Sequence, residues 1–258
     1  MRVLGCTGGI GSGKSYVSAI FEKMGIPVYD SDSRAKALYD TDEQLREEMV
    51  ALLGDEIIVD GVIQRPVIAS KIFGNAELLQ EVEKLVHPAV MRDFKRWLRE
   101  IEESVKKNET VAMAEREKIG EIGEIDEIDE IDEIDEIDEI DEIDEIDEID
   151  EIDEIDSELV KCGDNIPPFV ILESAILLEK PIVLEQVDKS LVVTAPLELR
   201  IERVIQRDNT TRERVLDRLG AQWSDERRIA LADFIIFADG KQALLPQIED
   251  VYKAMCEL

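Results

Sequence analysis

The sequence predicts an α/β fold with a parallel sheet of five strands, and three observations support this. Short apolar runs of the kind found in strands covered on both faces occur at residues 3–6, 27–29, 169–172, 190–194 and 234–237. Apolar residues between these runs recur at helical spacing. A glycine-rich segment joins the first run to the first helical pattern. Such alternation favours parallel strands with right-handed crossovers, whose carboxyl ends collect ligands.

The elements follow from local signals along the chain. A helix over 14–23 is closed by Gly25 and Pro27. Asp32 or Ser33 can cap the next helix, over 34–39. A capping box at 41–44 predicts a helix to residue 54, and Asp-Gly at 60–61 predicts a turn. A further helix is expected after 64–66. The helical pattern over 77–103 is interrupted at 87–88, where a proline is expected to start a fresh helix. The second half adds a helix after Pro196, a capping box at 210–213 and a closing helix over 245–255.

The segment Gly8-Gly9-Ile10-Gly11-Ser12-Gly13-Lys14-Ser15 fills the template G-x-x-x-x-G-K-[ST], the phosphate-binding loop of nucleoside-triphosphate enzymes. Glycines let backbone N–H groups curl around a phosphate, and the helix N-terminus adds further donors. Lys14 is expected to reach the outer phosphates and the Ser15 hydroxyl to bind Mg²⁺. The alternative is a plain glycine-rich turn before a helix. The residues expected to contact ATP are Gly8, Gly9, Gly11, Ser12, Gly13, Lys14, Ser15 and Tyr16.

Acidic residues follow two of the predicted strands: Asp30 and Asp32 come after the second, and Glu173 comes after the third. Each is therefore expected at the sheet edge that carries the glycine loop. A carboxylate beside a triphosphate can support Mg²⁺ or accept a proton from an attacking hydroxyl. A helix cap is the alternative for Asp32.

Cationic side chains supply further candidates. Arg203 and Arg207 lie on one helical face at i, i+4, where they can neutralise charge on a transferred phosphoryl group or simply face solvent. His87 is the only histidine, and either a turn or capping role or a substrate contact is open to it.

Composition excludes several classes of protein. The chain has 258 residues and a net charge of −32, with no basic face that would favour nucleic acid. No apolar run approaches the length of a membrane span, and the first strand leaves no room for a signal peptide. Three widely spaced cysteines indicate reduced thiols rather than a disulfide or zinc site. We therefore expect a cytoplasmic protein that binds neither membrane nor nucleic acid.

Much of the negative charge is local. Residues 124–156 are eleven copies of Glu-Ile-Asp, and removing their 22 acidic side chains changes the net charge from −32 to −10. A period of three gives neither a helix nor a strand a single apolar face, and neighbouring carboxylates repel. We expect disorder, or at most a weak exposed helix, in a tolerated surface insertion. Gathering cations or basic partners is the alternative.

Taken in order, the motifs resemble the dephospho-coenzyme A kinase family over about four fifths of the chain. Similar elements are the opening 5–15, Val28-Tyr29-Asp30-Ser31-Asp32, Arg65 before Ile72-Phe73, Leu85-Val86-His87-Pro88, residues 173–179, residues 203–208, Arg218-x-x-x-Gln222 and residues 232–236. Two features depart from the pattern. Ala238 stands where the family often has an adenine-side asparagine, and the acidic tract has no counterpart.

The resemblance implies a three-layer P-loop kinase fold that phosphorylates the ribose 3′-hydroxyl of dephospho-coenzyme A with ATP and Mg²⁺. It implies Asp32 as the proton acceptor, Lys14 and the loop as the ATP site, Ser15 as the metal ligand and Arg207 as a catalytic lid residue. Acceptor contacts are then expected from Asp32, Arg65, His87 and Glu173.

We accordingly expect one domain over 1–258. Its core is 1–40 and 168–258, its helical acceptor-binding part is 41–106, its small helical lid is about 203–224, and an acidic insertion fills 109–164. The alternatives are another small-molecule or nucleoside monophosphate kinase of the same fold, or an inactive ATP-binding regulatory protein. The sequence contains no Asn-Lys-x-Asp element, which a GTPase would need for guanine, so a GTPase is not expected. The sequence leaves the oligomeric state undetermined.

Overall fold

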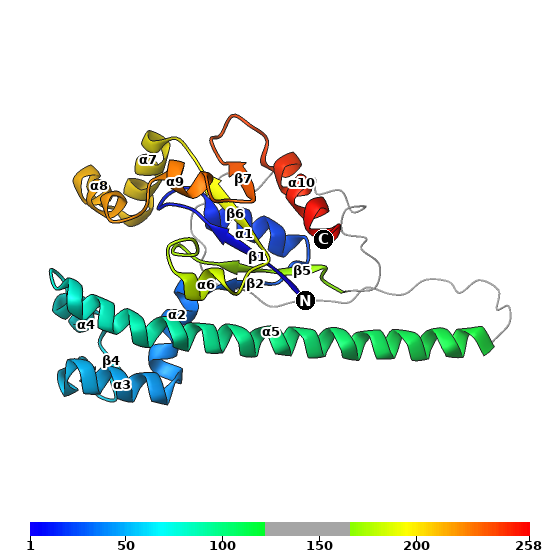
Figure 1. Cartoon of the computed structure of the whole chain (residues 1–258), viewed down its shortest axis with the longest axis horizontal. Helices are drawn as coiled ribbons and strands as arrows, with labels where there is room; N and C mark the ends of the chain where they lie inside the picture. The colour runs from blue at the N-terminus through cyan, green and yellow to red at the C-terminus, as the bar shows by residue number, and fades with distance from the viewer. Residues whose placement is uncertain (122–165) are drawn as a thin grey trace. The chain divides into compact units, whose positions relative to one another are not determined.

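The structure is a computed structural model that describes residues 1–121 and 166–258. Within these residues five strands form one parallel sheet in the order β2-β5-β1-β6-β7, as predicted (Figure 1). The strands are β1 (Arg2–Thr7), β2 (Val28–Asp30), β5 (Phe169–Glu173), β6 (Lys189–Thr194) and β7 (Phe234–Phe237). The predicted Asp60-Gly61 turn, with positive φ at both residues, joins the antiparallel pair β3 (Ile58–Val59) and β4 (Val62–Ile63).

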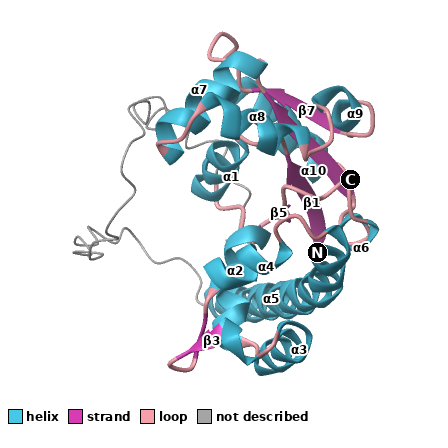
Figure 2. Cartoon of the chain, turned by 90° about the vertical axis from the view of Figure 1, so that its left-hand side faces the viewer, coloured by secondary structure: helices cyan, strands magenta, loops and turns pink. Residues whose placement is uncertain are grey.

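Helices fill the connections between the strands, as Figure 2 shows. The described helices are α1 (Lys14–Lys23), α2 (Ser31–Thr41), α3 (Glu43–Leu53), the 3₁₀ turn η1 (Asp55–Ile57), α4 (Arg65–Ile72), α5 (Ala76–Glu121), α6 (Pro181–Leu184), α7 (Leu197–Asp208), α8 (Arg212–Gly220), α9 (Asp225–Ile229) and α10 (Leu244–Cys256).

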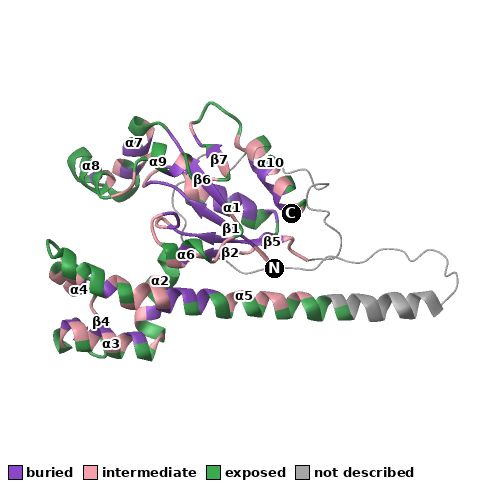
Figure 3. Ribbon diagram, viewed as in Figure 1, coloured by how far each residue is buried: buried purple, intermediate pink, exposed green. Residues whose placement is uncertain are grey.

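Strand β5 shows why the sheet is the middle of three layers. Its side chains alternate between the two faces, and all five residues are buried (Figure 3). Phe169 packs edge-on against Phe21 of α1 and contacts Tyr252 of α10, so these helices cover one face. Val170 and Leu172 belong to the core cluster with residues of α2 to α5, which covers the other face. A near-continuous apolar strand is the expected result of burial on both sides.

The strand register sets the edge at which a ligand binds. Glu173, the last residue of β5, pairs with Cys6 of β1 on one side and with Asp30 of β2 on the other. The segments that leave β1, β2 and β5 therefore start from one row at the carboxyl end of the sheet. This confirms the expectation that the glycine loop, the Asp30–Asp32 segment and Glu173 share an edge.

Two predicted helix caps are wrong in detail. Asp30, rather than Asp32 or Ser33, caps α2, because its carboxylate accepts from the N–H groups of both of those residues. Asp42, rather than Thr41, caps α3 and accepts from Leu45 N–H at 3.0 Å. Helix α2 therefore starts before the predicted residue 34, at Ser31, whereas α3 starts one residue later than a Thr41 cap predicts.

Two further helix starts also differ from the prediction. Thr211, rather than Thr210, caps α8. Pro88 starts no new helix but lies inside α5. A proline removes only one backbone donor, and the helix on both sides of it is buried in the core through Val82, Ala89 and Phe94. Tertiary packing therefore outweighs the local signal.

The chain divides into two compact units, residues 1–102 with 167–258, and residues 103–166. The first unit contains the whole sheet and the glycine loop. Helix α5 is helical through Glu121 and so enters the expected insertion at 109–164. The Glu-Ile-Asp tract, with the disorder expected of it, lies outside the described residues. No helix in the described ranges is both long and apolar enough to cross a bilayer.

Candidate active site

The glycine loop connects β1 to α1 at the carboxyl edge of the sheet. Gly11 and Gly13 have φ of +76° and +93°, in the left-handed region that glycine adopts without strain. Gly13 is the N-cap of α1 and makes no side-chain cap. The N-terminal N–H groups of α1 and the positive end of its dipole therefore face the loop, which is the arrangement that binds anions. Tyr16, the last expected ATP contact, is half-buried in the first turn of α1.

Lys14 and Ser15 meet the carboxylate of Glu173. The Lys14 ammonium forms an ion pair with Glu173 Oε1, and the Ser15 hydroxyl donates to the same oxygen at 2.8 Å. Glu173 is only 4% exposed. Burial works to lower the pKa of Lys14, but the charge and hydrogen bond of Glu173 prevail and raise it. The lysine is thus a fixed cation at the mouth of the loop.

Asp32 is the second residue of α2, and its carboxylate is free for chemistry. Because Asp30 caps the helix, the main-chain N–H of Asp32 is satisfied at 2.9 Å by Asp30 Oδ1. No described residue hydrogen-bonds the Asp32 side chain, which is exposed to solvent. Burial of its surroundings raises the pKa of Asp32, Lys14 lowers it, and the carboxylates of Asp30 and Glu173 raise it, with a net upward shift. Asp32 therefore lies within electrostatic reach of the loop lysine.

Two arginines of α7 occupy different positions. Arg203 donates to the carbonyl of Ala238 at 3.0 Å and lies close to Gly13, since a Cβ built on Gly13 would be 3.6 Å from the guanidinium. Arg207, one turn later, is exposed and binds the carboxylate of Asp208. The described contacts thus link Arg203, rather than the expected catalytic Arg207, to the loop.

The other expected acceptor contacts lie in the helical part. Arg65 is exposed at the start of α4, and its charge acts on Tyr39 of α2. His87 is half-buried in α5 beside the ion pair of Glu83 and Lys180, which is 2.6 Å long. Burial lowers the pKa of His87, Glu83 raises it and Lys180 lowers it, with a net downward shift. The described contacts link neither residue to the loop.

A buried polar cluster anchors the segment that carries Asp32. Asp93 of α5 accepts from the Tyr29 hydroxyl at 2.7 Å and from Arg34 Nε at 2.8 Å. Tyr29 belongs to β2 and packs on Phe94 and Trp97. Since Tyr29 and Arg34 lie on either side of Asp32 in the chain, α5 holds both ends of this segment.

Sequence reasoning missed a row of charged residues under the loop. Arg200 and Arg228 are 5% and 1% exposed, and they bind Asp225 and Glu179. A signal for Arg200 was available, because it shares the buried face of α7 with Ile201 and Val204. No local pattern marks Arg228, which lies in a helix of five residues.

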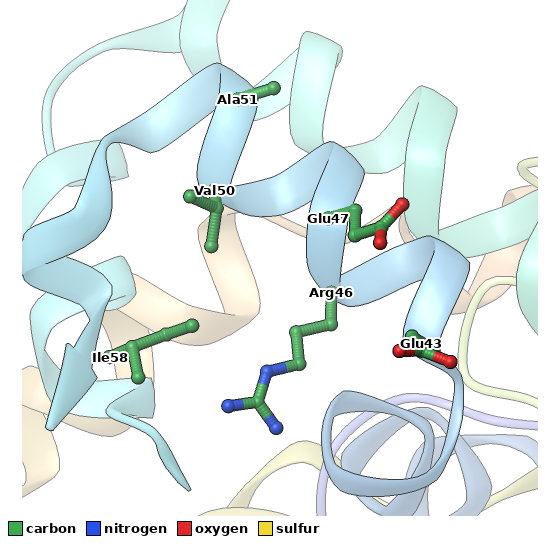
Figure 4. Close-up of a pocket in the computed structure, with 6 residues that line it drawn as sticks. All are labelled: Glu43, Arg46, Glu47, Val50, Ala51 and Ile58. Atoms are coloured by element: carbon green, nitrogen blue, oxygen red, sulfur yellow. The ribbon is translucent and has the colours of Figure 1, made fainter. Parts of the chain in front are cut away.

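A surface pocket lies elsewhere, beside α3 (Figure 4). It holds about 430 Å³, and its lining residues are Glu43, Arg46, Glu47, Val50, Ala51 and Ile58. None of these residues belongs to the glycine loop or to the Asp32 segment. We therefore assign the candidate active site to the carboxyl edge of the sheet, where Lys14, Glu173 and Asp32 lie.

The fold and this edge together define a nucleotide-dependent phosphotransferase of the P-loop class, because a phosphate cradle, a fixed lysine and a free carboxylate converge where a parallel sheet binds ligands. The dephospho-CoA kinase family model matches residues 2–115 and 152–243, and the chain belongs to that family. The interval between these two ranges contains most of the acidic tract.

Individual relatives agree with this assignment. A dephospho-CoA kinase of Bacteroides fragilis is 31% identical over 245 residues, which are 95% of this chain and 88% of the relative. One from Porphyromonas gingivalis is 46% identical over 102 residues, 40% of this chain and 50% of its own. One from Chlorobium chlorochromatii is 28% identical over 261 residues, covering 99% and 94%.

Solved structures share the fold. TT1252 from Thermus thermophilus superposes with a TM-score of 0.61 at 26% identity, covering 99% of this chain and 96% of that one. The dephospho-CoA kinase from Campylobacter jejuni gives 0.51 at 18% identity, with 100% and 97% covered. The predicted three-layer α/β fold is therefore confirmed.

Proposed function

We propose that this chain transfers the γ-phosphoryl group of ATP to the ribose 3′-hydroxyl of dephospho-coenzyme A, giving coenzyme A and ADP. Family membership supports the activity, and one geometric observation supports the site. Lys14 of the loop is paired with the buried Glu173, while the unbonded carboxylate of Asp32 lies within its electrostatic field. A donor held by Lys14 and an acceptor hydroxyl beside Asp32 would thus be neighbours.

Asp32 is the group that we assign to the acceptor. Its carboxylate would accept the proton of the 3′-hydroxyl as the oxygen attacks, which is the usual role of an aspartate in phosphoryl transfer. Its exposure favours this role, because a substrate hydroxyl can reach it, and so does its freedom from the helix cap.

The loop and the arginines are assigned to the donor. The loop N–H groups and Lys14 would bind the phosphates and hold the charge that develops during transfer. Arg203 is near the loop already. We keep Arg207 as a proposed lid contact that would leave Asp208 when the segment closes over the substrates, and closure would exclude water.

The residues present fit a magnesium ion that arrives with ATP. Among the described residues no group of three His, Cys, Asp or Glu side chains could hold a metal by itself. Mg²⁺ usually takes one or two protein oxygens and completes its shell with phosphates and water. The Ser15 hydroxyl would bind it and Glu173 would support it, and the ion would neutralise phosphate charge. Arg65 and His87 stay proposed contacts for the rest of the acceptor.

We also propose a cytoplasmic location, supported by the wide spacing of the three cysteines, which favours reduced thiols over a disulfide, and by the buried free thiol of Cys6. The function is tested by a coupled ADP-release assay with dephospho-coenzyme A, nucleoside monophosphates and free sugars as acceptors. We expect turnover with dephospho-coenzyme A alone and a product heavier by one phosphate. Preference for a nucleoside monophosphate would overturn the acceptor assignment, and ATP binding without turnover on any acceptor would favour the regulatory alternative.

A further inference from the structure

Ile10, in the middle of the glycine loop, has both of its main-chain polar groups held by side chains from distant parts of the sequence. Its N–H donates to Gln222 Oε1 at 3.0 Å, and its carbonyl accepts from Arg200 Nε at 3.0 Å. Arg200 lies in α7, and Gln222 follows α8. The N–H belongs to the peptide unit before Ile10 and the carbonyl to the peptide unit after it, so the two side chains restrain the orientation of both peptide planes.

Arg200 is itself rigidly placed. Its Nη1 donates to Asp225 Oδ2 at 2.6 Å, and the Thr194 hydroxyl at the end of β6 donates to the same oxygen at 2.8 Å. The guanidinium is therefore tied to Asp225 through one nitrogen and to the loop through another. Only arginine presents donors in such a planar fork.

A second buried arginine extends the connection. Arg228 donates to Glu179 Oε1 at 2.6 Å and to the carbonyl of Trp223 at 2.9 Å, and its Nη1 is 3.7 Å from Asp225 Oδ1. Two cations and two anions thus alternate from Glu179 to Arg200. Buried ion pairs contribute little net stability compared with apolar packing. A role in stability alone therefore explains this row of charges poorly. A role in fixing the orientation of the Arg200 guanidinium explains it better.

The loop also rests directly on Arg200. A side chain at Gly9 would collide with the Arg200 guanidinium, and one at Gly11 would collide with the Arg200 main-chain carbonyl. The lack of a side chain at Gly9 and Gly11 therefore has two effects. It leaves room for a phosphate, and it lets the loop backbone approach Arg200.

We infer that Arg200 and Gln222 are positioning residues for the ATP phosphates, which they serve by holding the two peptide units that flank Ile10 so that the following N–H groups of the loop face the phosphates. This rests on the proposed function, in which those phosphates occupy the loop. Because Gln222 lies in the segment between α8 and α9 and Asp225 begins α9, the donor site depends on residues far from the loop in sequence. The acceptor site, built on Asp32 and the helical part, does not.

Gln222→Met is the decisive variant. It keeps the length of the side chain, removes the acceptor for Ile10 N–H and leaves no buried charge behind. Gln186→Met is its matched control, since Gln186 is also half-buried and donates to a main-chain group, the carbonyl of Ile182, at 3.1 Å. Neither Gln186 nor Ile182 belongs to the loop. ATP affinity is measured by calorimetry without acceptor, and KM is measured for each substrate.

We expect Gln222→Met to weaken ATP binding about 5- to 10-fold, the effect of one lost hydrogen bond, and to raise the KM for ATP equally. The KM for dephospho-coenzyme A should change by less than about twofold, and Gln186→Met should leave both constants unchanged. Arg200→Lys should weaken ATP binding further, because its ammonium cannot serve Ile10 and Asp225 in the same geometry.

Unchanged ATP affinity in Gln222→Met overturns the inference, as does an equal loss of affinity for both substrates or an equal effect of Gln186→Met. If Arg200→Lys fails to fold, Gln222→Met decides alone. Failure of the proposed function would be distinguishable, because it would appear in the wild type as absent acceptor turnover, while the calorimetric comparison of the two glutamine variants would still give its answer.

Discussion

Asp30 Oδ1 accepts the main-chain N–H of Asp32 at 2.9 Å, so two aspartates separated by one residue have different tasks. Asp30 ends β2 and caps α2, whereas the carboxylate of Asp32 has no hydrogen-bond partner among the described residues. The pair therefore offers its own control for the role of the proton acceptor.

Asp32→Asn should lower turnover on the order of 10²-fold or more and leave ATP binding intact, because an amide cannot accept the proton of the 3′-hydroxyl. Asp30→Asn should cost much less, since asparagine caps a helix about as well as aspartate. Steady-state rates and calorimetric ATP affinities of both variants check this. Similar losses in the two, or an active Asp32→Asn enzyme, would remove Asp32 from the role.

The acid limb of kcat/KM should follow the ionisation of Asp32. Burial of its surroundings raises the pKa of Asp32 above the ordinary 3.8, Lys14 opposes this, and Asp30 and Glu173 add to it. The proton acceptor must be ionised, so activity should fall as the pH drops through that raised pKa. In Asp30→Asn one negative charge that raises the pKa of Asp32 is removed, so the acid limb of the kcat/KM profile should move to lower pH. A limb that moves upward would contradict the assignment.

Glu173→Gln should separate the binding of free ATP from that of magnesium-bound ATP. The Glu173 carboxylate now holds Lys14 and would repel incoming phosphates. Without that charge, ATP in excess chelator should bind at least about tenfold tighter, as expected for one unit charge at close range, while turnover with Mg²⁺ falls. Titrations with and without Mg²⁺ check this. Weaker binding of free ATP would mean that Glu173 serves only to position Lys14.

Asp93→Asn should destabilise the unit that carries the sheet by about 1–3 kcal/mol at neutral pH, because it weakens bonds from Tyr29 and Arg34 to a buried carboxylate. Burial works to raise the pKa of Asp93, but Arg34 and Tyr29 lower it on balance. Its contribution is thus present above the ordinary 3.8 and is lost as the pH falls through the depressed value. Denaturant unfolding at several pH values should show the wild-type advantage shrinking in acid. Tyr29→Phe, which loses one hydrogen bond, should cost about 1 kcal/mol.

Deletion of residues 124–156 should leave turnover and melting temperature nearly unchanged. The family model has no match over residues 116–151, and the sheet and loop lie in the unit formed by 1–102 and 167–258. Thermal melts and the ADP-release assay on the shortened chain check this. A large loss in either would give the acidic tract a structural or catalytic role.

Local patterns predicted the strands, the glycine loop and the edge at which Asp32 and Glu173 lie, because burial on two faces, glycine dihedral angles and parallel register each leave a trace within a few residues. Helix starts were less predictable. Asp30 caps α2 in place of Asp32 or Ser33, which have equal propensity for that position, so the point at which the chain leaves β2 decides the cap. Asp42 caps α3 in place of Thr41, the weaker capping residue of the two. Pro88 remained inside α5 because the core on both sides outweighs one missing donor.

The sequence by itself determined the reaction class and the place of the phosphate loop that contains Lys14 and Ser15, since such a loop is a contiguous motif. Only the tertiary structure decided which distant side chains complete it. It paired Glu173 with Lys14, brought Arg203 rather than Arg207 beside Gly13, and laid Arg200 and Gln222 against Ile10. Those contacts join residues 159 to 212 positions apart. Their geometry follows from strand order and helix packing, which no local spacing records.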